Sequence, residues 1–173
     1  MNRSLFRTIT VVLLTLVALT ARAETAAGSY SPHLVQVDDR TVIAGLLDLD
    51  ALHAAHPGSV LVVDLRTPPE GTAAEAEAAA ALGIDYTNIP VAGASVDPLQ
   101  VVQLRAALDD ADADTLVVVH CASGNRAGML WGALQVSEGA VLADVQASLS
   151  EVLNKEPTIQ GLEAYARTLN ADQ

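Results

Sequence analysis

Two runs of apolar residues, 59–65 and 115–120, constrain the fold of this 173-residue chain more than any other feature. Both consist mainly of Val and Leu, and each has the length of a strand rather than a helix. A short unbroken apolar run is typical of a strand that is buried on both faces, as in parallel sheets. Parallel strands need long crossover connections, which are usually helices. The runs therefore predict an α/β fold with a mostly parallel central sheet flanked by helices.

The rest of the chain supplies the other elements of such a fold. Alternating patterns and turn residues predict further strands at 33–37, 41–44 and 84–89. Helical spacing of Leu and Ala, with breaks at Gly and Pro, predicts helices at 46–56, 75–82, 98–108, 126–137, 141–153 and 158–169. Strands thus alternate with helices from residue 41 to residue 137.

The N-terminal residues have the pattern of an export signal. Arg3 and Arg7 precede an apolar segment at 8–20, and Ala21-Arg22-Ala23 has the small-x-small form of a cleavage site. We expect a signal peptide at 1–23, a flexible leader at 24–32 and a single domain at 33–170. The protein is then exported, to the periplasm, and the alternative is an uncleaved membrane anchor.

Acidic residues dominate the charge of the chain. The net charge is −12, and loss of the three arginines in 1–23 makes it −15. Such a surface repels nucleic acids and anionic membranes, which bind through basic patches. We therefore expect no nucleic acid and, after signal cleavage, no membrane partner. A small anionic substrate remains compatible with a locally positive pocket.

The single cysteine, Cys121, lies where the second apolar run turns into a helix. The segment His120-Cys121-Ala122-Ser123-Gly124-Asn125-Arg126-Ala127 places a glycine in the turn and an arginine at the helix start. Backbone N–H groups of such a turn bind anions and favour the reactive thiolate. The planar guanidinium of Arg126 matches phosphate or sulfate oxygens two at a time. The pattern predicts a nucleophilic site, and its alternative is an inert buried cysteine.

These residues resemble the phosphate loop of cysteine-dependent tyrosine and dual-specificity phosphatases. The segments Val60 to Arg66 and Gly83 to Val91 are similar to those that precede this loop in that superfamily. The stretch from about 34 to 165 is most similar to the small bacterial phosphatase-like domain that also occurs fused to β-lactamase-like hydrolases. The resemblance implies phosphate-monoester hydrolysis through a phosphocysteine on Cys121. The acidic surface favours a small substrate over a phosphoprotein for this reaction, and we expect no cofactor.

Two details depart from the phosphatase pattern. Four residues separate Cys121 from Arg126, whereas these phosphatases have five, and Ala127 stands where they usually carry Ser or Thr. The shorter spacing resembles the loop of rhodanese-type sulfurtransferases, which implies a Cys121 persulfide as the alternative chemistry. A noncatalytic anion-binding or protein-binding module is the third interpretation.

The loop residues have separate expected roles. We expect His120, Ala122, Ser123, Gly124, Asn125 and Ala127 to form the substrate-binding loop. Gly124 supplies a tight backbone conformation, while Ser123 and Asn125 brace the loop by hydrogen bonds. His120 either orients the loop through a backbone hydrogen bond or is a satisfied buried histidine. Arg126 clamps the bound anion or, alternatively, pairs with a carboxylate at the helix start.

Asp97 is the candidate general acid, because it is the only carboxylate in the loop 91–98. It also stands before Pro98 and three residues before Gln100, which is the pattern of a helix N-cap with a capping box. Asp64 and Arg66 either frame the pocket or form a structural ion pair. No group of residues has the spacing of a metal site, so we expect no metal.

Overall fold

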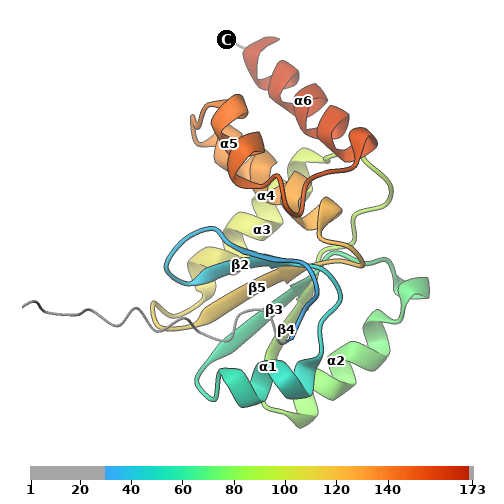
Figure 1. Cartoon of the computed structure of the whole chain (residues 1–173), viewed down its shortest axis with the longest axis vertical. Helices are drawn as coiled ribbons and strands as arrows, with labels where there is room; N and C mark the ends of the chain where they lie inside the picture. Colours follow the sequence, from blue (N-terminus) through green and yellow to red (C-terminus); the bar gives the residue numbers. More distant parts are fainter. Residues whose placement is uncertain (1–29, 172–173) are drawn as a thin grey trace, which may run out of the picture.

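The computed structural model describes residues 30–171, which form a five-stranded sheet covered by helices (Figure 1). The order across the sheet is β1 (Leu34–Gln36), β2 (Thr41–Ala44), β5 (Leu116–His120), β3 (Val60–Asp64) and β4 (Asp85–Asn88). The pair β1 and β2 is antiparallel, and all other neighbours are parallel. The predicted α/β class with a mostly parallel central sheet is confirmed.

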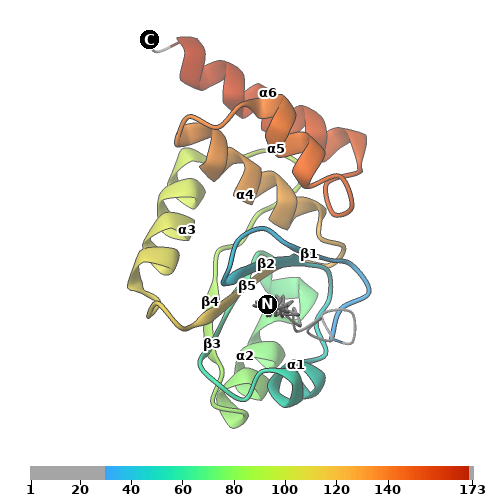
Figure 2. The same ribbon diagram turned by 60° about the vertical axis from the view of Figure 1, so that its left-hand side comes forward.

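Helices lie on both faces of the sheet, as the buried strands require. They are α1 (Leu49–Ala55), α2 (Thr72–Ala81), α3 (Pro98–Asp110), α4 (Asn125–Ser137), α5 (Leu142–Ser148) and α6 (Glu156–Ala171), with a short 3-10 helix η1 (Pro68–Glu70) before α2. Figures 1 and 2 show α1 and α2 on one face and α3 and α4 on the other. The helices α5 and α6 pack against α4.

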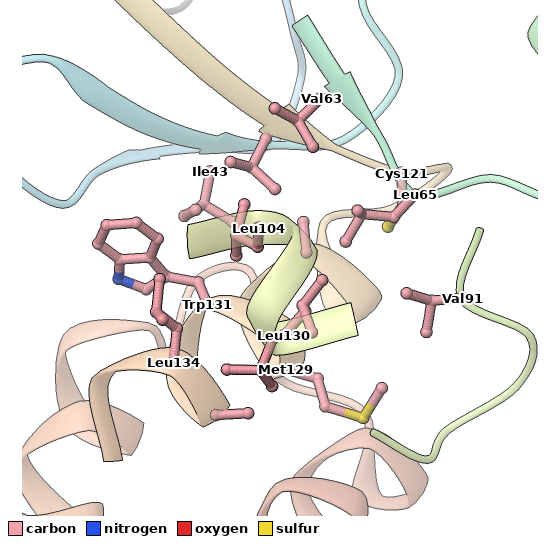
Figure 3. Close-up of a cluster of buried hydrophobic side chains, with 14 of the residues drawn as sticks. Ile43, Val63, Leu65, Val91, Leu104, Cys121, Met129, Leu130, Trp131 and Leu134 are labelled. Carbon is pink, nitrogen blue, oxygen red and sulfur yellow. The ribbon is translucent and has the colours of Figure 1, made fainter. Parts of the chain in front are cut away.

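The side chains of β5 alternate between two apolar clusters. Val117, Val119 and Cys121 belong to the cluster under α3 and α4, part of which is shown in Figure 3. Val118 belongs to the cluster under α1 and α2. Because successive side chains of a strand point to opposite faces, His120 and Cys121 face different layers of the molecule. This sidedness determines what each residue contacts.

Several helices begin where local caps place them rather than where the apolar pattern starts. The side chain of Asp48 accepts a hydrogen bond from Ala51 N (2.9 Å), so α1 begins at Leu49 rather than at residue 46. The helix α2 begins directly after Gly71, whose φ is +94°. The predicted elements are otherwise present, with bounds shifted by a few residues.

The N-terminal expectations fall largely outside the described residues. The expected signal peptide and residues 24–29 of the expected leader lie there. The expected flexible leader is too long at its C-terminal end. Tyr30 and Ser31 are both buried, and Tyr30 O accepts a hydrogen bond from Asp48 N (2.9 Å). These two residues belong to the folded domain. Within 30–171, no helix combines the length and the apolar character that crossing a membrane requires.

Candidate active site

Cys121 lies directly after the central strand β5, at the carboxyl edge of the sheet. Its N–H donates to Ala44 O (3.3 Å), and the carbonyl of the preceding residue, His120, accepts from Leu65 N (2.9 Å). Neighbouring strands therefore hold the backbone on both sides. The Cys121 side chain is 1% exposed and lies beside Leu65 at the edge of the cluster in Figure 3. In an open α/β sheet, this edge of the central strands is where ligands bind.

Gly124 forms the turn from Cys121 into α4. Its φ is +82°, in the left-handed region that side chains rarely adopt, and it is the N-cap residue of α4. A Cβ at this position would lie 3.0 Å from Val152 Cβ. Two observations therefore explain why glycine is required here: the positive φ of the backbone and the close approach of Val152, which follows α5.

Asn125 braces the loop against the segment between α5 and α6. Its Oδ1 accepts from Asn154 N (3.0 Å), Lys155 N (2.7 Å) and Thr158 Oγ1 (3.2 Å). Its Nδ2 lies 3.2 Å from Asn154 Oδ1, to which it donates. The Asn125 residue is 4% exposed, while the N–H groups of Asn154 and Lys155 that it accepts from are partly buried. The expected bracing role of Asn125 is confirmed.

Arg126 donates to oxygens of Glu70 and Val91, and it also interacts with Cys121, whose side-chain hydrogen bond contributes to the raised pKa of Arg126. Nη1 donates to Glu70 Oε2 (2.9 Å) and to Val91 O (3.1 Å), and Nη2 donates to Glu70 Oε1 (2.6 Å). A guanidinium has five N–H donors. The three bonds leave the Nε–H and one Nη2–H, which form a second fork along the side of the guanidinium. The carboxylate pairing that we gave as the alternative is present, and it still leaves a bidentate donor.

The Glu70–Arg126 pair is strong electrostatically. Hydrogen bonds from Arg126, and smaller contributions from the Thr67 N–H and hydroxyl, lower the pKa of Glu70 to about 2. The pKa of Arg126 is raised, first by its bonds to Glu70 and also by the charge of Cys121. Glu70 was not predicted as a site residue, although Thr67-Pro68-Pro69-Glu70 has the S/T-x-x-E form of a capping box, which the structure contains.

His120 does not take the role expected for it in the substrate-binding loop. Its side chain is fully buried on the α2 face of the sheet, on the side away from Cys121. Nε2 lies 2.8 Å from Glu75 Oε1 and 3.5 Å from Asp64 Oδ1, but neither ring nitrogen makes a well-aligned hydrogen bond. The ring therefore neither orients the loop by a side-chain bond nor faces a ligand over Cys121, because strand alternation points it away.

The residues around His120 form a buried ionic cluster. Arg66 contacts both Asp64 and Glu75, and Tyr86 donates to Asp64 Oδ2 (2.7 Å). Burial alone would raise the pKa of Asp64, but the bonds from Arg66 and the charge of His120 outweigh it and lower this pKa. Asp64 and Arg66 thus form a structural ion pair rather than a pocket rim.

The same cluster brings together potential metal ligands. One ligand atom each of Asp64, Glu75 and His120 lies within 4.8 Å of the others. Both Asp64 oxygens already accept bonds, Oδ1 from the N and Nε of Arg66 and Oδ2 from Arg66 Nη2 and Tyr86. The cationic guanidinium of Arg66, which contacts both carboxylates, already compensates one of their two negative charges. The cluster is therefore better suited to support the strand ends than to hold a cation.

Asp97 is the N-cap of α3. Its side chain accepts from Leu99 N (2.8 Å), and its own N–H donates to Gln100 Oε1 (3.0 Å), which completes the capping box. The residue is exposed. Asp97 lies on the loop that begins at Val91, and the carbonyl of Val91 accepts a hydrogen bond from Arg126. The same loop packs closely on α6, because a Cβ added at Gly161 would clash with Ala94 O. The role of Asp97 as a general acid stays a prediction.

Lys155 is a second cation beside the loop, and it was not predicted from the sequence. Its Nζ donates to Ser123 Oγ (3.3 Å). The described site thus contains a buried cysteine, a helix N-terminus and two cations from different segments of the chain.

Comparison with known proteins identifies the family. A family model described as "Beta-lactamase hydrolase-like protein, phosphatase-like domain" matches residues 33–138. The chain belongs to this phosphatase-like family. A beta-lactamase hydrolase-like protein of Xylella fastidiosa is 31% identical over 117 residues, which cover 64% of the chain. The chain spans about a quarter of that relative, since the match covers 27% of its length.

Solved structures of phosphatases share the fold of this family member. A glycine-to-alanine form of Tk-PTP has a TM-score of 0.65 at 16% identity, over 81% of this chain and 98% of that one. TpbA from P. aeruginosa, solved as a cysteine-to-serine variant in complex with pTyr, has a TM-score of 0.62 at 18% identity, over 87% and 94%. The protein is thus a phosphatase-like domain with a protein tyrosine phosphatase-like fold.

Proposed function

We propose that this phosphatase-like domain hydrolyses phosphate monoesters with Cys121 as the nucleophile. The observation that carries the proposal is the pair of Arg126 donors that donate to no protein oxygen within residues 30–171, on a guanidinium that interacts with Cys121. Glu70 and Val91 occupy three of the guanidinium donors, and the remaining two lie parallel on one edge. Two parallel N–H donors match two oxygens of a phosphate.

The reaction has two displacement steps. The Cys121 thiolate attacks phosphorus, the S–P bond forms, and the bond to the leaving oxygen breaks with its electron pair on that oxygen. Water then attacks the phosphocysteine, phosphate leaves, and the thiolate is restored. In both steps the loop N–H groups and Arg126 stabilise charge on the phosphoryl oxygens.

The leaving oxygen needs a proton, and Asp97 remains the candidate donor. It is exposed, and it is carried by the loop whose first residue, Val91, binds Arg126. The same loop is pressed against Gly161 of α6 at Ala94. These contacts support a fixed position for this loop next to the site.

Phosphate release from a generic aryl phosphate tests the proposal. The mature protein is expected to release phosphate, and Cys121→Ser is expected to lose this activity. The Arg126→Lys variant keeps the charge but not the planar fork, so we expect it to lose most of kcat/KM. If Cys121→Ser releases phosphate at the wild-type rate, the proposed nucleophile is wrong.

A sulfurtransferase is the second candidate, and the loop length is the observation that favours it. Only four residues separate Cys121 from Arg126, and Ala127 has no hydroxyl to assist the departure of the thiolate. A persulfide needs less room than a phosphocysteine. Incubation with thiosulfate and a thiol or cyanide acceptor, with Cys121→Ser as control, tests it. Cys121-dependent thiocyanate or persulfide without phosphatase activity would favour this candidate.

The setting of the reaction is part of the proposal. We infer that the protein is exported, acts in the periplasm and takes a small anionic substrate rather than a nucleic acid or membrane. Cys121 is the only cysteine, so it cannot pair within the chain. Its 1% exposure supports its survival as a free thiol in an oxidising compartment. Fractionation of cells that express the full chain tests the location.

A further inference from the structure

The cations of the described residues are few, and most of them have partners within the fold. Arg66 contacts the carboxylates of Asp64 and Glu75. Arg105 contacts Glu138, and Arg126 contacts Glu70. Arg40 donates to the carbonyl oxygens at the end of α3. Among the Lys and Arg residues of 30–171, only Lys155 and Arg167 have neither a carboxylate oxygen within 4 Å nor a side-chain hydrogen bond to a backbone carbonyl. Lys155 is also the only lysine of the chain.

These two residues lie at opposite ends of α6. Arg167 is near the C-terminal end of the helix, where a cation is favourable. Lys155 directly precedes the helix, and its carbonyl accepts from Thr158 N (3.0 Å) and Ile159 N (3.1 Å). A cation at a helix N-terminus is unfavourable unless an anion is nearby. The position of Arg167 is therefore favourable for its own helix. The first turn near Lys155 carries one acid, Glu156, but its carboxylate accepts from Gln160 Nε2 (2.8 Å) and does not contact the Lys155 Nζ.

The position of Lys155 is fixed by the active-site loop. Its backbone N–H donates to Asn125 Oδ1 (2.7 Å), and its Nζ donates to Ser123 Oγ (3.3 Å). Ser123 lies between Cys121 and Arg126. An ammonium has three N–H donors, and one of them is used by Ser123. Two donors and a full positive charge remain beside the loop, on an exposed side chain.

We propose that Lys155 binds a second anionic group of the substrate, next to the phosphate that Cys121 attacks. The inference rests on the proposed function of the same loop. The substrates are then small phosphate esters that carry a neighbouring carboxylate or second phosphate. The net charge of −12 repels large polyanions, while two cations at the loop attract a compact compound with two anionic groups.

A matched pair of substrates tests the inference. Phenyl phosphate and 2-carboxyphenyl phosphate differ by one carboxylate, and the ratio of their kcat/KM values measures selectivity for the second anion. We expect Lys155→Met to lower the ratio of the carboxylated to the plain ester about tenfold, as for loss of a close charge pair. Lys155→Arg is expected to restore most of the ratio. Arg167→Met removes the same charge at the far end of α6 and is the matched control.

The outcomes separate this inference from the proposed function. An equal fall for both esters in Lys155→Met, or an unchanged ratio, overturns the role of Lys155. If the wild type hydrolyses neither ester, the proposed function fails, and binding decides the role of Lys155 instead. Calorimetry on Cys121→Ser with phosphate and with pyrophosphate then applies. Selective weakening of pyrophosphate binding by Lys155→Met supports the inference, and equal affinities with and without Lys155 refute it.

Discussion

Substitution of Asn125 by Ala is expected to destabilise the protein more than any other single change in the loop apart from Gly124. The Asn125 Oδ1 accepts from the backbone N–H groups of Asn154 and Lys155 at 3.0 and 2.7 Å. Ala offers no acceptor, so both donors lose their partner. Thr158 Oγ1 also bonds to Oδ1, but it keeps its bond to Lys155 O (2.7 Å).

The magnitude follows from the number of donors that are left unpaired. A donor that loses its partner in a shielded position costs about 1–3 kcal/mol. Both N–H groups here are only partly buried, so the lower end of that range applies to each. We expect Asn125→Ala to lower the free energy of unfolding by about 2–3 kcal/mol, which corresponds to a fall of several degrees in Tm.

Urea unfolding, followed by circular dichroism, measures this change. The matched control is Asn154→Ala, which removes the partner of Asn125 Nδ2 but leaves both backbone bonds to Asn125 in place. Because Asn154 is exposed, water replaces the lost contact, and we expect a loss below about 1 kcal/mol. Equal losses in the two variants, or a loss below about 1 kcal/mol in Asn125→Ala, would refute the view that Asn125 ties the loop to α6.

Three further predictions concern the neighbours of the loop. Glu70→Gln is expected to lower kcat/KM about tenfold, since Arg126 loses a charged partner. The pKa of Glu70 is low in the folded state, so the ion pair stabilises the fold above pH about 4.5 and this stabilisation is lost as pH falls toward 2. The difference in unfolding free energy between wild type and Glu70→Gln should therefore shrink as the pH falls through that range. A difference that stays constant with pH contradicts the contribution of the ion pair. Gly124→Ala is expected to cost at least about 1–2 kcal/mol from the positive φ alone, and Val152→Ala should relieve only the contact part in a double-mutant cycle. Asp97→Asn should slow hydrolysis of an alkyl phosphate about a hundredfold more than that of 4-nitrophenyl phosphate, with stability retained because Asn caps well; equal rates for the alkyl ester in both proteins would exclude Asp97 as the acid.

Much of the fold was predictable because its signals are local. The two apolar runs, the alternation of strands and helices, and the breaks at Gly and Pro each depend on a few neighbouring residues. The same holds for the loop, where Cys121, Gly124 and Arg126 occupy the predicted strand-to-helix turn. The capping box of Asp97 with Gln100 was also readable, because both partners lie within one helical turn.

The surroundings of the site were not predictable in the same way. Glu70 and Arg126 are 56 residues apart, and Lys155 meets Ser123 across 32 residues. Such pairs depend on which strands are adjacent and on the path of each crossover, and neither is encoded in local periodicity. The period of two placed His120 and Cys121 on opposite faces, but only the packing of α2 decided which face each one took.

The sequence by itself thus determined the α/β fold and the loop that presents Cys121, since strand period, helix capping and turn conformation are properties of short segments. Only the tertiary structure decided the electrostatics of that loop. Parallel strand pairing brought Glu70 to Arg126, and the packing of α6 on α4 brought Lys155 to Ser123. Charges act through space over a few ångströms, so their partners become known only when distant segments are packed together.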